Sequence, residues 1–229
     1  MIVSHKHKFI FIKTEKTAGT SVEIALSSIC GADDIITPIS KKDEATRLKL
    51  GYRGKQNYAV PFSKYGWNDF MNLLRTRKRI EFYNHMSALE IRQYIDQPCW
   101  DDYFKFTFER NPYDKLISWY YWRVRNNECA SITEFIKSGL AASIRGYELY
   151  TDQDEMLADK VYKFEHLDSE LIDLSKKLNL EQPLQLPKTK AKAHTRKDKR
   201  HYSDVLNEFE RNWVSREYKK EIELFGYSY

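Results

Sequence analysis

The chain has 229 residues, of which 41% are hydrophobic and 31% charged, and its net charge is +5. This length argues against a second large domain, so we expect a single α/β domain over residues 1–229. The three widely spaced cysteines argue against a disulfide framework and a thiolate zinc site. The excess of positive charge suits an anionic ligand, but it does not distinguish a nucleotide from a sulfated glycan or a nucleic acid. No segment resembles a signal peptide or a membrane span, so the expected location is cytoplasmic.

The first predicted unit is a strand, a loop and a helix. Residues 8–13 form a short apolar run rich in β-formers, which predicts a buried strand. A polar loop follows over residues 14–21. Helical spacing then gives one apolar face, formed by Val22, Ala25, Leu26 and Ile29. Residues 31–66 show no clear period, except for a short helix expected near residues 42–50.

The second half of the chain repeats the alternation. We expect helices over residues 67–76 and, from the capping box Ser87-x-x-Glu90, over residues 87–95. Strands are expected at residues 80–84, 103–108 and 161–164. Asn111 and Pro112 predict an N-cap and a first helical position. Leucines spaced along residues 167–178 predict another helix, and one long helix is expected over residues 203–224.

This order predicts an α/β fold. Alternating strands and helices favour a mostly parallel central sheet flanked by helices on both faces. Loops that follow parallel strands meet at one edge of such a sheet, where open α/β folds bind ligands.

The loop over residues 13–21 reads KTEKTAGTS and joins a predicted strand to a helix. Free backbone N–H groups and the helix dipole favour an anion there. Gly19 permits close approach to a phosphate, Lys16 adds charge, and hydroxyl donors come from Thr17, Thr20 and Ser21. The loop is P-loop-like, but it is not a Walker A motif, because its lysine precedes the glycine.

A second element follows the strand at residues 103–108. It reads FERNPYDKLISWY and places Arg110 just before an N-capped helix, with Ser118 nearly two turns inside that helix. Arginine is the side chain best suited to fork onto a phosphate. Two anion sites are therefore expected at one edge of the sheet.

Together these motifs resemble those of the PAPS-dependent sulfotransferases, especially the branch of carbohydrate and heparan 2-O-sulfotransferases. In that family a PKTxGTS loop cradles the 5′-phosphosulfate of 3′-phosphoadenosine 5′-phosphosulfate (PAPS). The matching loop positions here are Lys16, Thr17, Ala18, Gly19, Thr20 and Ser21. The arginine and serine of the second family motif hold the 3′-phosphate, and Arg110 and Ser118 match them. Residues 161–167 and the ending over residues 223–227 also resemble the family.

The resemblance implies transfer of a sulfuryl group from PAPS to an acceptor hydroxyl on a glycan. Lys16 would assist the leaving group and His85 would be the base, because histidine has a suitable pKa and His85 matches the family's position. The rate should then rise with pH through a group that titrates near neutrality. Two departures stand out: Glu15 replaces the usual proline, and Lys115 replaces a common arginine.

Two further segments receive expected roles. Residues 31–79 match no family element and are expected to be an insertion that shapes the acceptor site. Residues 188–200 hold seven Lys or Arg and one Asp. This basic loop is either a solvated face or, as in the family, a cover over the 3′-phosphate, with Arg196 and Lys197 as its candidates.

Two other functions stay open. A P-loop kinase acting on a small molecule would need Mg²⁺ ligands and a Walker lysine, and the sequence shows no metal-spaced cluster of His, Asp and Glu. A nucleic-acid-binding module would need aromatic side chains within the basic run, and residues 188–200 contain none. We therefore expect no metal and no nucleic-acid partner.

Overall fold

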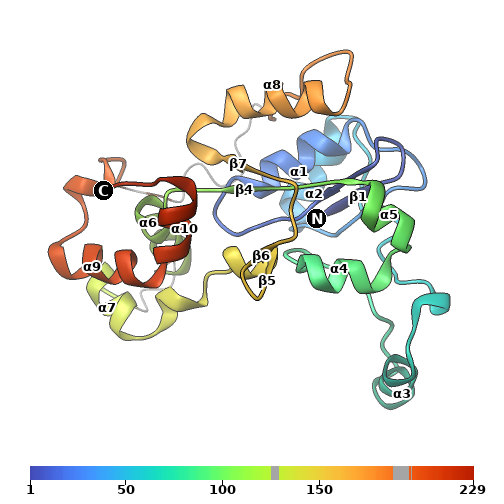
Figure 1. Ribbon diagram of the computed structural model, residues 1–229, viewed down its shortest axis with the longest axis horizontal. Helices are drawn as coiled ribbons and strands as arrows, with labels where there is room; N and C mark the ends of the chain where they lie inside the picture. The colour runs from blue at the N-terminus through green and yellow to red at the C-terminus, as the bar shows by residue number, and fades with distance from the viewer. Residues whose placement is uncertain (125–128, 188–195, 197) are drawn as a thin grey trace.

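The computed structural model describes residues 1–124, 129–187, 196 and 198–229. A central sheet has the strand order β3-β1-β2-β4-β7 (Figure 1). Its strands are β1 (Ile2–Ser4), β2 (Phe9–Phe11), β3 (Ile35–Ile36), β4 (Phe104–Glu109) and β7 (Lys160–Lys163). Strands β2, β4 and β7 pair in parallel, while β1 runs antiparallel to both of its neighbours. Four strands thus share one direction, as the mostly parallel prediction requires.

Helices cover both faces of this sheet. On one face lie α1 (Gly19–Ser27) and α8 (Leu167–Lys177), and on the other lie α4 (Ala88–Tyr94) and α5 (Gln97–Asp102) (Figure 1). Side chains alternate along a strand, so Phe9 and Phe11 pack with α1 and α8, whereas Ile10 and Ile12 pack toward α4. The predicted α/β architecture is confirmed.

A third apolar cluster lies beyond the carboxyl ends of the parallel strands. It joins α6 (Pro112–Arg123), α7 (Ile132–Lys137), α9 (Glu208–Glu217) and α10 (Lys219–Phe225). Buried side chains at its centre include Ile117, Phe135 and Val214. This group of helices forms one side of the edge where the sheet's loops meet (Figure 1).

The remaining elements are short or peripheral. They are α2 (Lys41–Lys49), α3 (Trp67–Thr76), the small hairpin of β5 (Thr151–Asp152) and β6 (Glu155–Met156), and the 3₁₀ turns η1 (Phe62–Lys64), η3 (Leu140–Ser143), η4 (Tyr147–Leu149), η5 (Phe164–His166) and η6 (Tyr202–Asp204). Predicted helices over residues 42–50 and 67–76 are thus confirmed as α2 and α3. The predicted caps also form, since the side chains of Ser87 and Asn111 accept backbone N–H groups of α4 and α6. No helix in the described part of the chain is long and apolar enough to span a membrane.

Two predicted elements are wrong. The strand expected at residues 80–84 is only an isolated bridge between Ala59 and Glu81, because two short extended segments meet there for a few hydrogen bonds. The long helix expected over residues 203–224 is divided. Asn207 and Glu210 form a capping box that begins α9, and Tyr218 leaves helical geometry before α10 begins. Strands β1 and β3 were not predicted.

Candidate active site

The loop after β2 has an unusual backbone. Lys16 and Ala18 both adopt the left-handed conformation, with φ of 64° and 58°, and Ala18 is the N-cap of α1. Non-glycine residues adopt this conformation rarely. Alternation between left- and right-handed residues directs successive backbone N–H groups to one side, which makes a concave site for an anion. The start of α1 adds its free N–H groups to the same place.

Gly19 has a packing role in the loop that the sequence did not reveal. Its φ is not positive, but a Cβ there would lie 2.8 Å from Cγ of Lys13. The lysine stem thus occupies the space that a side chain at residue 19 would need. Glycine at this position therefore allows Lys13 to pass beneath the first turn of α1.

Lys13 ends in a buried cluster of charges. Its Nζ lies 2.7 Å from Oε2 of Glu23, which also pairs with Arg47 at 3.2 Å and with the Met1 ammonium at 3.5 Å. Burial by itself would raise the pKa of Glu23, but Lys13, the Met1 ammonium and Arg47 outweigh it and hold the pKa at about 2. A paired buried carboxylate of this kind fixes the base of the loop.

His85 contacts the same lysine from the other side. Its Nδ1 lies 2.8 Å from the Lys13 carbonyl oxygen. Since a carbonyl only accepts, Nδ1 carries the proton and Nε2 keeps a free lone pair. Burial, followed by the charge of Lys13, lowers the pKa of His85 to about 3. The imidazole is therefore neutral at physiological pH, with Nε2 as a hydrogen-bond acceptor.

Arg110 joins the second element to the first. Its NH1 donates to the Lys16 carbonyl oxygen at 3.1 Å and its Nε to Asp114 at 2.8 Å. Its guanidinium lies over the Phe164 ring, 4.2 Å from the centroid. The carboxyl ends of β2 and β4 are thus tied together at the place where the ligand was expected.

Asp114 binds a second arginine as well. Its other carboxylate oxygen accepts a hydrogen bond from Arg196, so one carboxylate holds both guanidinium groups. Burial alone would raise the pKa of Asp114, but Arg110 and then Arg196 lower it. Two arginines converging on one carboxylate form a donor set of the kind that also binds a phosphate.

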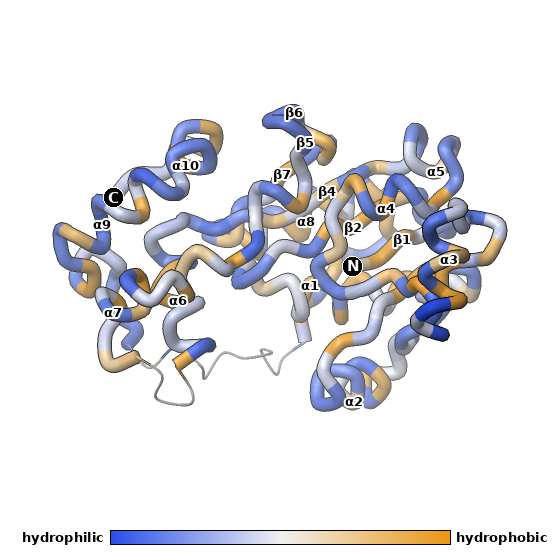
Figure 2. Tube along the Cα trace, turned by 90° about the horizontal axis from the view of Figure 1, so that it is seen from below, coloured by the Kyte–Doolittle hydropathy of each residue, from blue (hydrophilic) through white to orange (hydrophobic). Residues whose placement is uncertain are grey.

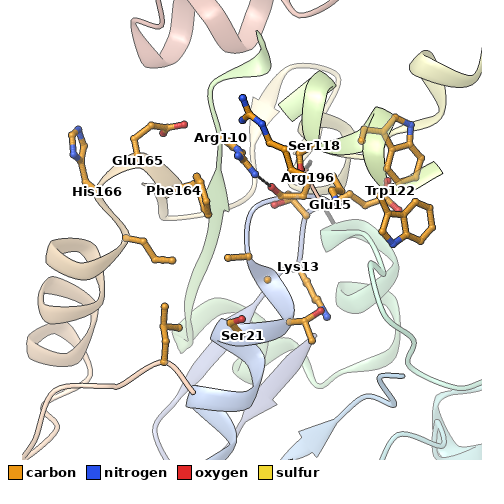
Figure 3. A pocket seen from close by; sticks show the side chains of 18 of the residues that line it. Lys13, Glu15, Ser21, Arg110, Ser118, Trp122, Phe164, Glu165, His166 and Arg196 are labelled. Carbon is orange, nitrogen blue, oxygen red and sulfur yellow. Dashed lines mark hydrogen bonds between the residues drawn. The ribbon is translucent and has the colours of Figure 1, made fainter. Parts of the chain in front are cut away.

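A cavity of about 830 Å³ lies between these groups (Figure 3). This is a volume typical of a site for a ligand of nucleotide size. The residues that line it are Lys13, Thr14, Glu15, Lys16, Ala18, Gly19, Thr20, Ser21, His85, Arg110, Ser118, Trp119, Trp122, Phe164, Glu165, His166, Leu167, Asp168, Ser169, Leu186, Arg196 and Lys199. Across the residues that the structure describes, no group of three or more His, Cys, Asp and Glu side chains could hold a metal ion.

Most of the sequence-predicted site residues meet in this cavity. His85 and Lys16 line it, as do Arg110, Ser118 and Arg196. Thr17 does not: it is buried beneath the loop, and its hydroxyl lies 3.0 Å from that of Thr14. Lys197 lies outside the described residues.

The site also contains residues that the sequence did not point to. Trp119 and Trp122 stack with ring centroids 4.8 Å apart, and Nζ of Lys16 lies 5.7 Å from the centroid of Trp122. Both rings come from the helix of Ser118, and Trp122 lies three residues after Trp119 and four after the serine. That spacing was the available signal. For Lys13 the sequence contained no signal except its position at the end of a predicted strand.

The two departures from the family motifs have structural roles. Glu15 accepts the Arg145 backbone N–H at 2.8 Å, and its own N–H donates to the Arg145 carbonyl at 3.0 Å. Lys115 is buried against Glu109, with Nζ 3.0 Å from Oε2, and does not line the cavity. Each residue therefore stabilises a neighbouring segment.

Comparison with known proteins places the chain in a family. The model of the family described as "Sulfotransferase family" matches residues 1–228. An uncharacterized protein of Archaeoglobus fulgidus is 32% identical over 104 residues, which cover 43% of this chain and 87% of that protein. No solved structure matches the chain significantly. The match over nearly the full length shows that the chain belongs to the sulfotransferase family.

Proposed function

We propose that the chain transfers a sulfuryl group from PAPS to a hydroxyl group of a glycan by in-line displacement. One observation carries the proposal. The loop after β2 and the start of α6 are joined by the 3.1 Å hydrogen bond from Arg110 to the Lys16 carbonyl, and both open into the cavity that holds His85. Such an arrangement supports two anionic groups and a proton acceptor within one site.

The donor set fits a nucleotide with two separate anionic groups. The backbone around Ala18, Gly19 and Thr20, with the hydroxyls of Thr20 and Ser21, would hold the 5′-phosphosulfate. Arg110, Ser118 and Arg196, together with Lys197 from the basic loop, would hold the 3′-phosphate. The Asp114 carboxylate holds Arg110 and Arg196 converged on one point.

Two side chains would act on the reacting atoms. Nε2 of His85 would take the proton of the acceptor hydroxyl, because Nδ1 is already committed to the Lys13 carbonyl. The ammonium of Lys16 would stabilise the charge that develops on the leaving phosphate oxygen. The glycan acceptor, the cytoplasmic location and the acceptor-shaping role of residues 31–79 stay predictions. The cavity lining described above contains no residue from 31–79.

Membership of the sulfotransferase family favours this proposal over a kinase or a nucleic-acid-binding module. Titration calorimetry with adenosine 3′,5′-bisphosphate, ATP with Mg²⁺, and an oligonucleotide separates the three. We expect adenosine 3′,5′-bisphosphate to bind without a divalent metal and to raise the melting temperature. Binding of ATP only in the presence of Mg²⁺, with none of the bisphosphate, would contradict the proposal.

A further inference from the structure

Helix α3 presents an unusual surface. Trp67, Phe70, Met71 and Leu74 follow the spacing i, i+3, i+4 and i+7, which places them on one face of the helix. All four are exposed, by 78%, 42%, 49% and 75% respectively. No residue of α3 is buried. A stable helix normally buries its apolar face, so this face has the character of a binding surface.

The helix is nevertheless held to the body of the protein. Leu73, on a different side of α3, packs against the main apolar cluster, and Asp69 accepts a hydrogen bond from Tyr94 at 3.4 Å. The exposed face therefore points away from the contact that anchors the helix. Figure 1 shows α3 projecting from the layers around the sheet, and Figure 2 shows apolar segments beside polar ones along it.

The apolar face extends beyond the helix. Tyr65 bridges Phe62 to Phe70, with ring centroids 5.2 Å and 5.3 Å apart. Phe62 is itself 48% exposed. We call the five exposed side chains of this surface, Phe62, Trp67, Phe70, Met71 and Leu74, the α3 patch.

Basic residues border the α3 patch. Arg75, Arg77, Lys78 and Arg79 follow within and just after the last turn of α3, and all four are exposed. The guanidinium of Arg79 lies 4.4 Å from the centroid of the Phe62 ring, so the charges adjoin the apolar side chains directly. An apolar face with tryptophan, bordered by Lys and Arg, is the pattern of a helix that lies in a membrane interface.

We infer that the α3 patch docks this protein on the surface of an anionic lipid membrane. The apolar side chains would enter the boundary between headgroups and acyl chains, and the basic residues would contact acidic headgroups. Charge complementarity decides between this occupant and a second copy of the chain. A second copy would present the same set of exposed basic residues around its own patch, rather than the acidic groups that complement them.

The size of the α3 patch also favours a membrane over a second copy of the chain. A stable protein interface buries roughly 800 Å² per partner and takes about 20–30 residues from each, many more than the five side chains of the α3 patch. Membrane docking has no such threshold, because its strength grows with apolar insertion and with each basic residue near acidic lipid.

Co-sedimentation with vesicles tests the inference. The full chain is mixed with phosphatidylcholine vesicles that contain or lack phosphatidylserine, at low and at high salt. We expect binding only with phosphatidylserine, and weaker binding at high salt. Leu74→Asp should abolish binding, while Leu224→Asp, at an exposed leucine of α10, should leave it unchanged.

Two double variants with the same change in net charge test whether binding depends on the position of the basic residues. Arg77→Glu/Lys78→Glu should weaken binding by about tenfold or more, whereas Lys41→Glu/Lys42→Glu, on exposed residues of α2, should have a much smaller effect. Circular dichroism and the melting temperature verify folding of each variant. Absence of binding to phosphatidylserine vesicles would overturn the inference, as would equal losses in the two charge variants. Concentration-dependent dimerisation that Leu74→Asp abolishes, without vesicle binding, would assign the patch to a second copy instead.

Discussion

The imidazole Nδ1 of His85 lies 2.8 Å from the carbonyl oxygen of Lys13, and the side chain of Lys13 passes beneath Gly19 to reach Glu23. One lysine therefore orients the candidate base through its backbone and supports the phosphate loop through its side chain. This connection sets the tautomer of His85 and the position of its free nitrogen relative to the anion site.

Replacement of His85 should reduce turnover without affecting nucleotide binding. His85 has φ of 62°, so His85→Asn is a better variant than His85→Ala, because asparagine tolerates this backbone and lacks a basic nitrogen. We expect a fall of about a hundredfold to ten-thousandfold in turnover for either variant, the usual scale for a general base. Affinity for adenosine 3′,5′-bisphosphate, measured by calorimetry, should stay nearly unchanged.

If His85→Asn folds normally and retains most of its activity, the base lies elsewhere. Glu15, which lines the cavity, would be tested next, followed by His194, which lies outside the described residues.

The pH dependence of the rate should differ from the sequence-based expectation. Because burial and Lys13 lower the pKa of His85 to about 3, the base is already neutral well below neutrality. The acidic limb assigned to His85 should therefore appear far below its ordinary pKa of 6.5. A pH–rate profile with saturating PAPS measures it. A limb near neutrality that disappears in His85→Asn would show that His85 is charged at physiological pH in the complex.

The free energy of unfolding should also depend on the protonation of His85. The folded pKa of His85 is lower than the unfolded one, so the unfolded chain binds more protons between about pH 3 and pH 6.5. The contribution of His85 to folding is complete above this window and is lost as the pH falls through it. Urea denaturation at neutral pH and near pH 3 measures this. Between these two conditions the free energy of unfolding should fall more for the wild type than for His85→Asn. Equal losses would mean that the folded state does not suppress protonation of His85.

Arg110→Ala should weaken the binding of adenosine 3′,5′-bisphosphate more than the binding of adenosine 5′-phosphate. Only the first ligand carries the phosphate assigned to Arg110, and a lost charged hydrogen bond costs about 1.5–3 kcal/mol, or roughly tenfold or more in affinity. Some loss for both ligands is expected, because Arg110 also donates to the Lys16 carbonyl. Calorimetry with both ligands measures the difference. Arg216→Ala, on an exposed arginine of α9, is the control for charge, and equal losses for both ligands would assign Arg110 a structural role.

Gly19→Ala should destabilise the protein and weaken the nucleotide site together. The new Cβ would lie 2.8 Å from Cγ of Lys13, in a place where the stem is buried and cannot easily move. Overpacking of this kind costs about 1–3 kcal/mol in the free energy of unfolding.

Gly66→Ala is the matched control, since its Cβ would meet only the Asp69 carboxylate at 3.6 Å. Its cost should stay below about 1 kcal/mol, the scale of a changed N-cap. Urea denaturation of both variants makes the comparison, and equal stability would show that Lys13 can leave its position.

The sequence by itself determined the elements whose signals are local. The apolar run before Lys13 and the N-cap Asn111 each predicted an element that the structure contains, because strand burial and capping depend on neighbouring residues. The two motif loops predicted an edge of the sheet at which both now line one cavity, since loops after parallel strands must meet there.

Only the tertiary structure decided how the site residues act on one another. The link from Lys13 to His85 spans 72 positions, and the bond from Arg196 to Asp114 spans 82, so no periodicity or local spacing could reveal them. The protonation state of His85 follows from its burial, which depends on how distant elements pack around it. The exposure of α3 was also hidden, because an apolar stripe of helical spacing reads the same whether it faces a core or solvent.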